Sequence, residues 1–109
     1  MNFTYLASPY THADPAVREG RFRAACLVAS KMMLVGEVTF SPIAHSHPIE
    51  VESGVVSDGE FWKRQDEPYL MACTKLAVLM IPGWKESRGV QHEIDVATKR
   101  GIPIEYIQP

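Results

Sequence analysis

The chain has 109 residues, 46% of them hydrophobic and 22% charged, which is the composition of one globular domain with a single core. Its formal net charge of −2 gives no electrostatic basis for binding duplex nucleic acid or an anionic membrane surface. No apolar run is long enough to span a membrane, and the start lacks the basic residues of a signal peptide. We therefore expect a cytoplasmic protein with one domain over residues 1–109.

A strand and a long helix are the first expected elements. Residues 2–7 are rich in aromatic and β-branched side chains and precede a Ser-Pro pair, which predicts the first, central strand. Asp14 followed by Pro15 is typical of a helix start, and Gly36 of its end. The apolar face expected for this helix comprises Phe22, Ala25, Cys26, Ala29, Met32 and Met33. The helix also carries arginines that either form a solvated face or supply one contact to a substrate phosphate: Arg18, Arg21 and Arg23.

A second strand and a histidine-containing loop are expected next. Residues 37–40 predict the strand, and residues 41–48 (SPIAHSHP) a loop at its carboxyl end. His45 and His47, followed by glutamates, invite a metal site, but two imidazoles on one loop without a cysteine pair are weak support, and we expect no metal. Lining a substrate pocket or ordering the loop fits them better. The polar, glycine-containing residues 50–59 predict a mobile segment over the site.

The next expected helix contains a proline. Ser57 and Glu60 have the spacing of a capping box, and apolar residues then recur at helical intervals up to the next strand. Pro68 removes a backbone N–H and clashes with the preceding turn. We therefore expect a kink or a new helix start near Asp66.

The last part of the chain predicts a strand, a capped helix and a second strand. Residues 76–81 and 102–107 are apolar runs, while Ser87 is a good N-cap and Gly101 a good helix stop. Together the elements predict an α/β fold: a small doubly wound (Rossmann/flavodoxin-like) parallel sheet of four to five strands flanked by helices. No G-x-G-x-x-G follows the first strand and no P-loop motif is present, so neither kind of nucleotide site has support.

The start of the last helix offers the most specific chemistry. Ser87, Gly89 and Glu93 fall on its first two turns, at the carboxyl end of a strand, where open α/β sheets bind ligands. Unpaired N–H groups, the helix dipole and a serine hydroxyl suit a phosphate. Glu93 lies about 9 Å further along the axis, within reach of the sugar of a nucleotide bound there. The alternative is a capped surface helix with a solvated glutamate.

One segment of the chain resembles a known family. Residues 84–103 (WKESRGVQHEIDVATKRGIP) resemble the signature of the nucleoside 2-deoxyribosyltransferase superfamily, in which a serine or threonine beside a glycine precedes a glutamate, an alanine, a glycine and a proline. Residues 5–11 (YLASPYT) resemble its first strand and loop. The likeness covers nearly the whole chain and is closest to small, mostly uncharacterised bacterial and phage members, which share the FSP, HSHP and PGW stretches.

The resemblance implies cleavage of the N-glycosidic bond of a nucleoside or (deoxy)nucleoside 5'-monophosphate. Glu93 would attack the anomeric carbon, and water or another base would resolve the covalent glycosyl-enzyme. No cofactor is implied. The implied assembly is a homodimer or homotetramer in which a neighbour contributes to the pocket.

The resemblance also implies supporting roles. Asp66 helps to orient Glu93 or handles the proton of the leaving base, unless it is only an N-cap of the restarted helix. A departing base needs a proton, and the candidate donors are Asp66, Tyr10, His45 and His47.

Contacts to the substrate are implied for two loops. Ser8, Tyr10 and His12 are candidates to contact sugar, base or phosphate, unless the Ser-Pro pair is only a turn. Ser87 and the N–H groups near Gly89, with Ser8, would hold a phosphate or a 5'-hydroxyl. Ser87 favours a 5'-monophosphate, because the deoxynucleotide N-glycosidases of the superfamily have a serine at the matching place.

Other functions stay open. A non-catalytic nucleotide sensor would use the same crevice, with Glu93 binding a ribose hydroxyl instead of attacking carbon. A structural or interaction module would bind no nucleotide. Hydrolase and base-exchange transferase differ only in the acceptor, and the residues favour neither; they also leave the base and the sugar open.

Overall fold

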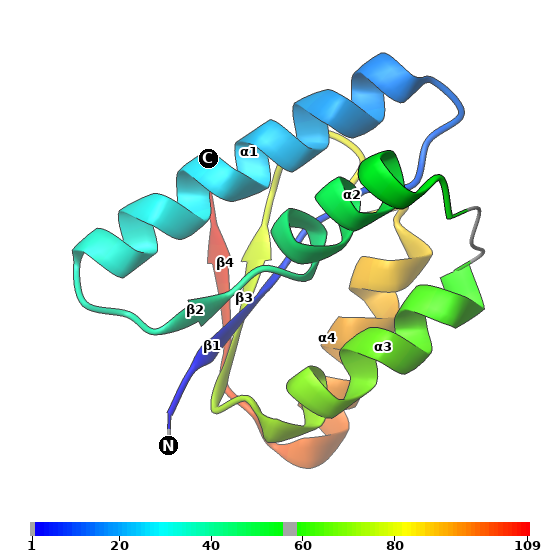
Figure 1. Ribbon diagram of the computed structural model, residues 1–109. Coiled ribbons are helices and arrows are strands. Elements are labelled where there is room, and N and C mark those ends of the chain that lie inside the picture. Colours follow the sequence, from blue (N-terminus) through cyan, green and yellow to red (C-terminus); the bar gives the residue numbers. More distant parts are fainter. Residues whose placement is uncertain (1, 56–58) are drawn as a thin grey trace.

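The chain folds into a four-stranded parallel sheet with helices on both faces (Figure 1). The computed structural model describes residues 2–55 and 59–109. The elements are β1 (Thr4–Ala7), α1 (Pro15–Leu34), β2 (Thr39–Phe40), α2 (Pro42–Ser53), α3 (Gly59–Ala72), β3 (Lys75–Leu79), α4 (Arg88–Arg100) and β4 (Ile104–Ile107). The strand order β2-β1-β3-β4, with all pairs parallel, confirms the predicted doubly wound α/β fold.

Each face of the sheet carries its own half of the core. On one face Tyr5 and Val78 pack with residues of α3 and α4, whereas on the other Leu6 and Ala77 pack against α1. Successive residues of β1 and β3 therefore point to opposite faces, and both faces are covered. Figure 1 shows α1 on one side of the sheet and α3 and α4 on the other. This double cover explains why the central strands read as continuous apolar runs.

The start of α1 is as predicted. Asp14 caps the helix by accepting the Ala16 N–H at 2.8 Å, and Pro15 takes the first helical position. The buried residues of the helix are Ala25, Val28, Ala29 and Met32. The predicted face is wrong at Met33, which is 53% exposed, because a rotation of about 100° per residue carries this position away from the buried stripe.

The predicted loop over residues 41–48 is wrong, because these residues begin α2. Ser41 accepts the Ala44 N–H at 3.1 Å, and Pro42 takes the first helical position. The Ser-Pro pair is therefore a cap and helix start, the same device that begins α1. Pro48 lies inside the helix, which continues beyond it.

The segment expected to be mobile, residues 50–59, is partly helical. α2 continues to Ser53, and Gly54 ends it with φ of 69°, donating its N–H to the Glu50 carbonyl at 2.9 Å. The predicted capping box falls on Ser57, outside the described residues.

α3 is one helix across Pro68, so of the two alternatives expected near Asp66, a kink or a new helix start, the new start is wrong. Pro68 removes one backbone hydrogen bond, but the helix continues beyond it to Leu70, which is only 1% exposed in the core. Asp66 therefore lies in a helix interior and is not an N-cap. Its carboxylate is available for other contacts.

The two thiols lie on opposite faces of the sheet. Cys73 is buried in the core beneath α4, and Cys26 is partly exposed on α1; both are free. Among the helices that the structure describes, none combines the length and apolar character needed to cross a membrane.

Candidate active site

A cleft of about 1090 Å³ opens at the carboxyl ends of β1 and β3. The loops that follow these strands form its wall together with parts of α2, α3 and α4. From β1 the chain proceeds to β2 on one side and later to β3 on the other, so the strand order reverses between β1 and β3. Open α/β sheets bind ligands at such a switch point.

Glu93 lies in the second turn of α4, with its carboxyl group against the central strand. The fully buried Tyr5 of β1 donates its hydroxyl hydrogen to Glu93 Oε2. Removal from water raises the pKa of Glu93 from 4.5 to about 8; the Tyr5 hydrogen bond opposes this shift, and negative charge on Asp66 and Glu67 adds to it. Glu93 therefore keeps its proton in most molecules at neutral pH, yet it ionises close to that pH.

Asp66 lines the same cleft from α3. Burial raises the pKa of this carboxyl group from 3.8 to about 6. At neutral pH Asp66 is thus mostly ionised while Glu93 is mostly protonated, so the two environments separate their protonation states. An ionised Asp66 is suited to orient or polarise a neighbouring group rather than to give a proton to a leaving base.

The raised pKa of Glu93 predicts a pH dependence of folding stability. Glu93 ionises near 4.5 in the unfolded chain and near 8 in the fold, so between these values the folded state holds an extra proton and its stability falls as pH rises. We expect the free energy of unfolding to fall by about 2 kcal/mol from about pH 6 to pH 8 through this group. Urea denaturation should show a smaller fall for Glu93→Gln, and an equal fall in both proteins would contradict the assignment.

The start of α4 presents hydrogen-bond donors to the cleft. Ser87 Oγ accepts the Val90 N–H at 3.2 Å, and the Gln91 N–H donates to the Ser87 carbonyl at 3.0 Å. Within the described residues, the N–H groups of Arg88 and Gly89 have no protein acceptor. In this cap the Ser87 hydroxyl oxygen only accepts a hydrogen bond. The hydroxyl hydrogen of Ser87 can therefore still be donated to a ligand. These donors and the helix dipole make the site suitable for an anion.

Two neighbouring features fit a ligand at this place. Ser8, in the loop after β1, is 6% exposed, and its Oγ has no hydrogen-bond partner within the described residues. Leaving a buried hydroxyl unpaired costs about 1–3 kcal/mol, so a ligand oxygen in the cleft is a favourable partner for it. Gly89 leaves open space, since an added Cβ would meet only Ser87 Oγ, at 3.9 Å.

Tyr10 lines the cleft and is held from behind by His47. The Tyr10 hydroxyl is 2.7 Å from His47 Nδ1 and donates to Glu50 Oε2 at 3.0 Å. His47 is 7% exposed, and its Nε2 lies 2.7 Å from Glu19 Oε2. His47 thus supports a cleft residue without lining the cleft itself, and His45 is exposed on α2 outside the lining.

The cleft brings together six of the eight site residues that the sequence predicts: Glu93, Asp66, Ser8, Tyr10, Ser87 and Gly89. His12, the weaker candidate of the first loop, also lines it. Across the part of the chain that the structure describes, no three His, Cys, Asp or Glu side chains gather in a way that would hold a metal ion.

Sequence reasoning missed several polar residues of the same cleft. His92 Nε2 lies 3.3 Å from Glu67 Oε2, and Glu50 accepts a hydrogen bond from Trp62 Nε1. Tyr5 had a recognisable signal, because a tyrosine in a central parallel strand needs a partner for its hydroxyl. The pairing of His92 with Glu67, 25 residues apart on another helix, had none.

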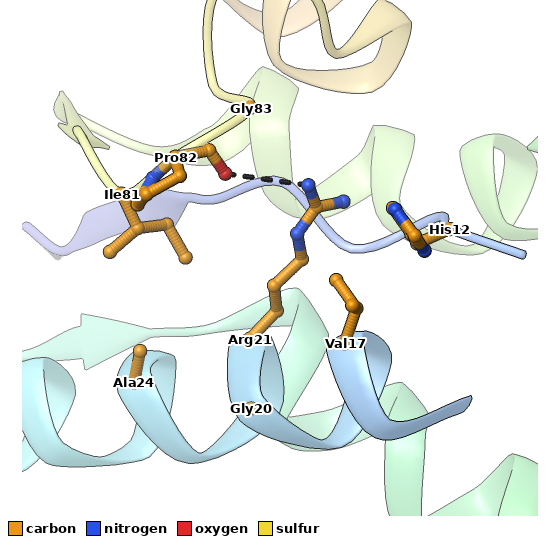
Figure 2. A pocket seen from close by; sticks show the side chains of 8 residues that line it. All are labelled: His12, Val17, Gly20, Arg21, Ala24, Ile81, Pro82 and Gly83. Atoms are coloured by element: carbon orange, nitrogen blue, oxygen red, sulfur yellow. Dashed lines mark hydrogen bonds between the residues drawn. The ribbon is translucent and has the colours of Figure 1, made fainter. Parts of the chain in front are cut away.

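A smaller hollow of about 500 Å³ lies between α1 and the loop after β3 (Figure 2). Arg21 rises from α1 and donates to the Pro82 carbonyl at 3.3 Å and to the Thr11 carbonyl at 2.9 Å. It therefore ties together the loops that follow β1 and β3. Gly83 has φ of 95°, and a side chain at this position would press against the Arg21 guanidinium. Arg21 thus links the two loops, and it also lines the cleft.

One family model matches the chain, over residues 2–108, and its description is "Domain of unknown function (DUF1937)". Among the curated proteins none matches. The match spans the entire sheet and every element that lines the cleft.

Proposed function

Because the chain belongs to the family described as a domain of unknown function (DUF1937), a description that states no activity, we propose a function from the cleft itself. The protein cleaves the N-glycosidic bond of a nucleoside or nucleoside 5'-monophosphate, by hydrolysis or by transfer to another base. The resemblance of residues 84–103 to the nucleoside 2-deoxyribosyltransferase signature supports the same reaction.

The observation that carries the proposal is the Tyr5–Glu93 hydrogen bond at the switch point. Tyr5 holds one carboxyl oxygen of Glu93 and leaves the other for a substrate. Once ionised, a carboxylate with a raised pKa is a better nucleophile than an exposed glutamate, because water does not stabilise its charge. It attacks the anomeric carbon through an oxocarbenium-like transition state, and water or a second base then resolves the glycosyl-Glu93.

The start of α4 supports a 5'-phosphate on the substrate. The cleft contains the Ser87 hydroxyl together with three groups that have no partner among residues 2–55 and 59–109: the N–H groups of Arg88 and Gly89 and the Ser8 hydroxyl. Glu93 lies about 9 Å along the helix axis from Ser87, a separation that suits a phosphate and an anomeric carbon on one sugar. The overall charge of −2 makes such a local site necessary, because the protein has no general attraction for anions.

The direct test is chromatographic detection of free base. The protein is incubated with ribo- and deoxynucleosides and their 5'-monophosphates, each with and without a second base as acceptor. Release of base mainly from monophosphates supports the full proposal, and release that requires the acceptor identifies a transferase. No release from any substrate would overturn the proposed activity.

Gly89→Ala tests the phosphate site without harming the fold. The added methyl has room in the free protein and replaces a helical glycine, so we expect unchanged or higher stability, by up to about 1 kcal/mol. The same methyl would occupy the space where a phosphate approaches the helix start. We expect KM for a monophosphate to rise about tenfold or more, with little change for the nucleoside, measured by base release. Equal changes for both substrates would contradict the phosphate site.

A nucleotide sensor is the second candidate, and the pKa of Glu93 favours it. A carboxyl group that keeps its proton at neutral pH can donate to a ribose hydroxyl instead of attacking carbon. Such a protein would melt at a higher temperature with nucleotide but release no base. The choice between water and a second base as acceptor, the homo-oligomer and the cytoplasmic location stay predictions.

A further inference from the structure

A chain of hydrogen-bonded polar side chains, buried at its central residue, leads from α1 to the wall of the cleft. We call Glu19, His47 and Tyr10 the tyrosine relay. Glu19 Oε2 is 2.7 Å from His47 Nε2, and His47 Nδ1 is 2.7 Å from the Tyr10 hydroxyl. The three residues come from α1, α2 and the loop after β1, so the fold assembles the relay from distant parts of the chain.

The relay is buried at its centre, His47, and reaches the cleft at Tyr10 and the protein surface at Glu19, which is 42% exposed. His47 is 7% exposed, and its ring stacks on Phe22 with ring centres 4.3 Å apart and planes 27° apart. Tyr10 meets the same ring edge-on, at 5.5 Å. Of the three relay residues only Tyr10 lines the cleft. A proton that moves along the relay can therefore reach the cleft only through the Tyr10 hydroxyl.

The contacts accommodate the arrangement of protons that a relay needs. Glu19 only accepts, so His47 Nε2–H donates to it. With the Tyr10 hydroxyl hydrogen directed at Glu50, the Tyr10 oxygen can accept from His47 Nδ1 when that nitrogen is protonated. In this arrangement the ring carries both protons, between a carboxylate and a phenol oxygen. The Tyr10 hydroxyl proton faces the cleft, and the His47 Nδ1 proton lies next to it on the side away from the cleft.

We propose that Tyr10 donates the proton to the departing base and that His47, positioned by Glu19, replaces it. This rests on the proposed function. As the bond between the anomeric carbon and the base nitrogen breaks, the electron pair goes to the base. The Tyr10 hydroxyl hydrogen turns from Glu50 to the base and bonds to it. The His47 Nδ1 proton moves to the Tyr10 oxygen, leaving a neutral imidazole that still donates to Glu19. When water attacks glycosyl-Glu93, its proton returns along the same path.

Two properties of the cleft support Tyr10 over Asp66 in this role. Burial, with a further contribution from Glu50, raises the pKa of Tyr10 to about 12, so the phenol keeps its proton at neutral pH. Asp66, with a pKa of about 6, is mostly ionised at that pH. A phenol with so high a pKa is by itself a weak acid, because giving up its proton would leave a tyrosinate. His47 prevents this by giving Tyr10 a new proton as the first one leaves.

Leaving-group dependence tests the relay. Release of an ordinary base is compared with release of nitrophenolate from the matching p-nitrophenyl glycoside 5'-phosphate, because nitrophenolate departs without a proton. For Tyr10→Phe we expect base release to fall about 100-fold or more while nitrophenolate release stays within about threefold. For Glu19→Gln, which keeps an acceptor for His47 but removes the charge, we expect kcat for base release to fall about tenfold with KM unchanged and nitrophenolate release intact.

The controls separate this inference from the proposed function and from loss of fold. Arg23→Gln removes the exposed partner of Glu19, 3.2 Å away on the same helix, and should leave both activities unchanged. If Tyr10→Phe lowers base release and nitrophenolate release equally, or lowers neither, the relay is overturned. Base release by the wild type would still support the proposed activity. If the wild type releases neither product, the proposed function and the relay fail together. Glu19→Gln tests the relay in a protein that should stay folded. Glu19 is 42% exposed, so its replacement should leave the melting temperature unchanged.

Discussion

Replacing Glu93 with Gln is expected to lower base release by at least about a thousandfold. The amide has nearly the shape of the carboxylate and can still accept the Tyr5 hydroxyl, but it cannot form the glycosyl ester. The fold should survive, because the substitution removes a carboxyl group that burial disfavours in its charged form. Base release under saturating substrate, with the melting temperature of both proteins, measures the effect.

Asp95→Asn is the matched control for this experiment. Asp95 lies on the same helix and is 59% exposed, in an ion pair with Lys99 at 3.0 Å. The substitution makes the same chemical change outside the cleft, so base release should stay near the wild-type rate. A Glu93→Gln protein that keeps more than about a tenth of the wild-type rate would exclude Glu93 as the nucleophile.

Tyr5→Phe is expected to have the second-largest effect, about 10- to 100-fold on kcat/KM near neutral pH. The Tyr5 hydrogen bond is the contact that holds the pKa of Glu93 down against burial, so its removal raises that pKa further. A smaller fraction of Glu93 is then ionised at a given pH. The rise of kcat/KM with pH should consequently move to higher pH, and part of the activity should return in alkaline buffer.

The direction of this shift is the critical result. Tyr5 is fully buried and fills its site with a ring that Phe reproduces, so a change in packing alone would lower activity equally at every pH. A pH profile that moves to lower pH, or keeps its position, would contradict the role assigned to the Tyr5 hydroxyl.

Local patterns predicted most of the fold because short-range physics decides those elements. The caps at Asp14 and Ser87 act within one turn of helix, and both are found where the residue types place them. α2 was mispredicted because Ser41-Pro42 has the composition of a turn as well as of a helix start. Tertiary packing also decides whether a helix continues through a proline, as α3 does at Pro68.

The part of the site that lies at the start of α4 could be predicted from the sequence, because helix geometry relates its residues to one another. Ser87, Gly89 and Glu93 lie on consecutive turns of α4, and their spacing already indicated an anion site followed by a carboxylate. The partners of these residues depend on long-range contacts. Tyr5 and Glu93 are 88 residues apart, and no sequence period relates them.

The relay shows the same limit. His47 lies 28 residues from Glu19 and 37 from Tyr10, so its role follows only from the packing of α2 on α1. The histidine pattern suggested that both imidazoles line a substrate pocket or order their loop. In the fold His47 is a buried support, and His45 lies outside the cleft lining.

Mass spectrometry of a trapped intermediate tests the central claim most directly. The protein is incubated with a 2-fluoro-2-deoxynucleoside 5'-monophosphate, in which fluorine slows breakdown of the glycosyl-enzyme, and then quenched in acid and digested. We predict a mass increase of one fluorodeoxyribosyl phosphate on the peptide that contains Glu93, and none in Glu93→Gln. Base release by the wild type with no adduct, or with an adduct on another residue, would contradict the account.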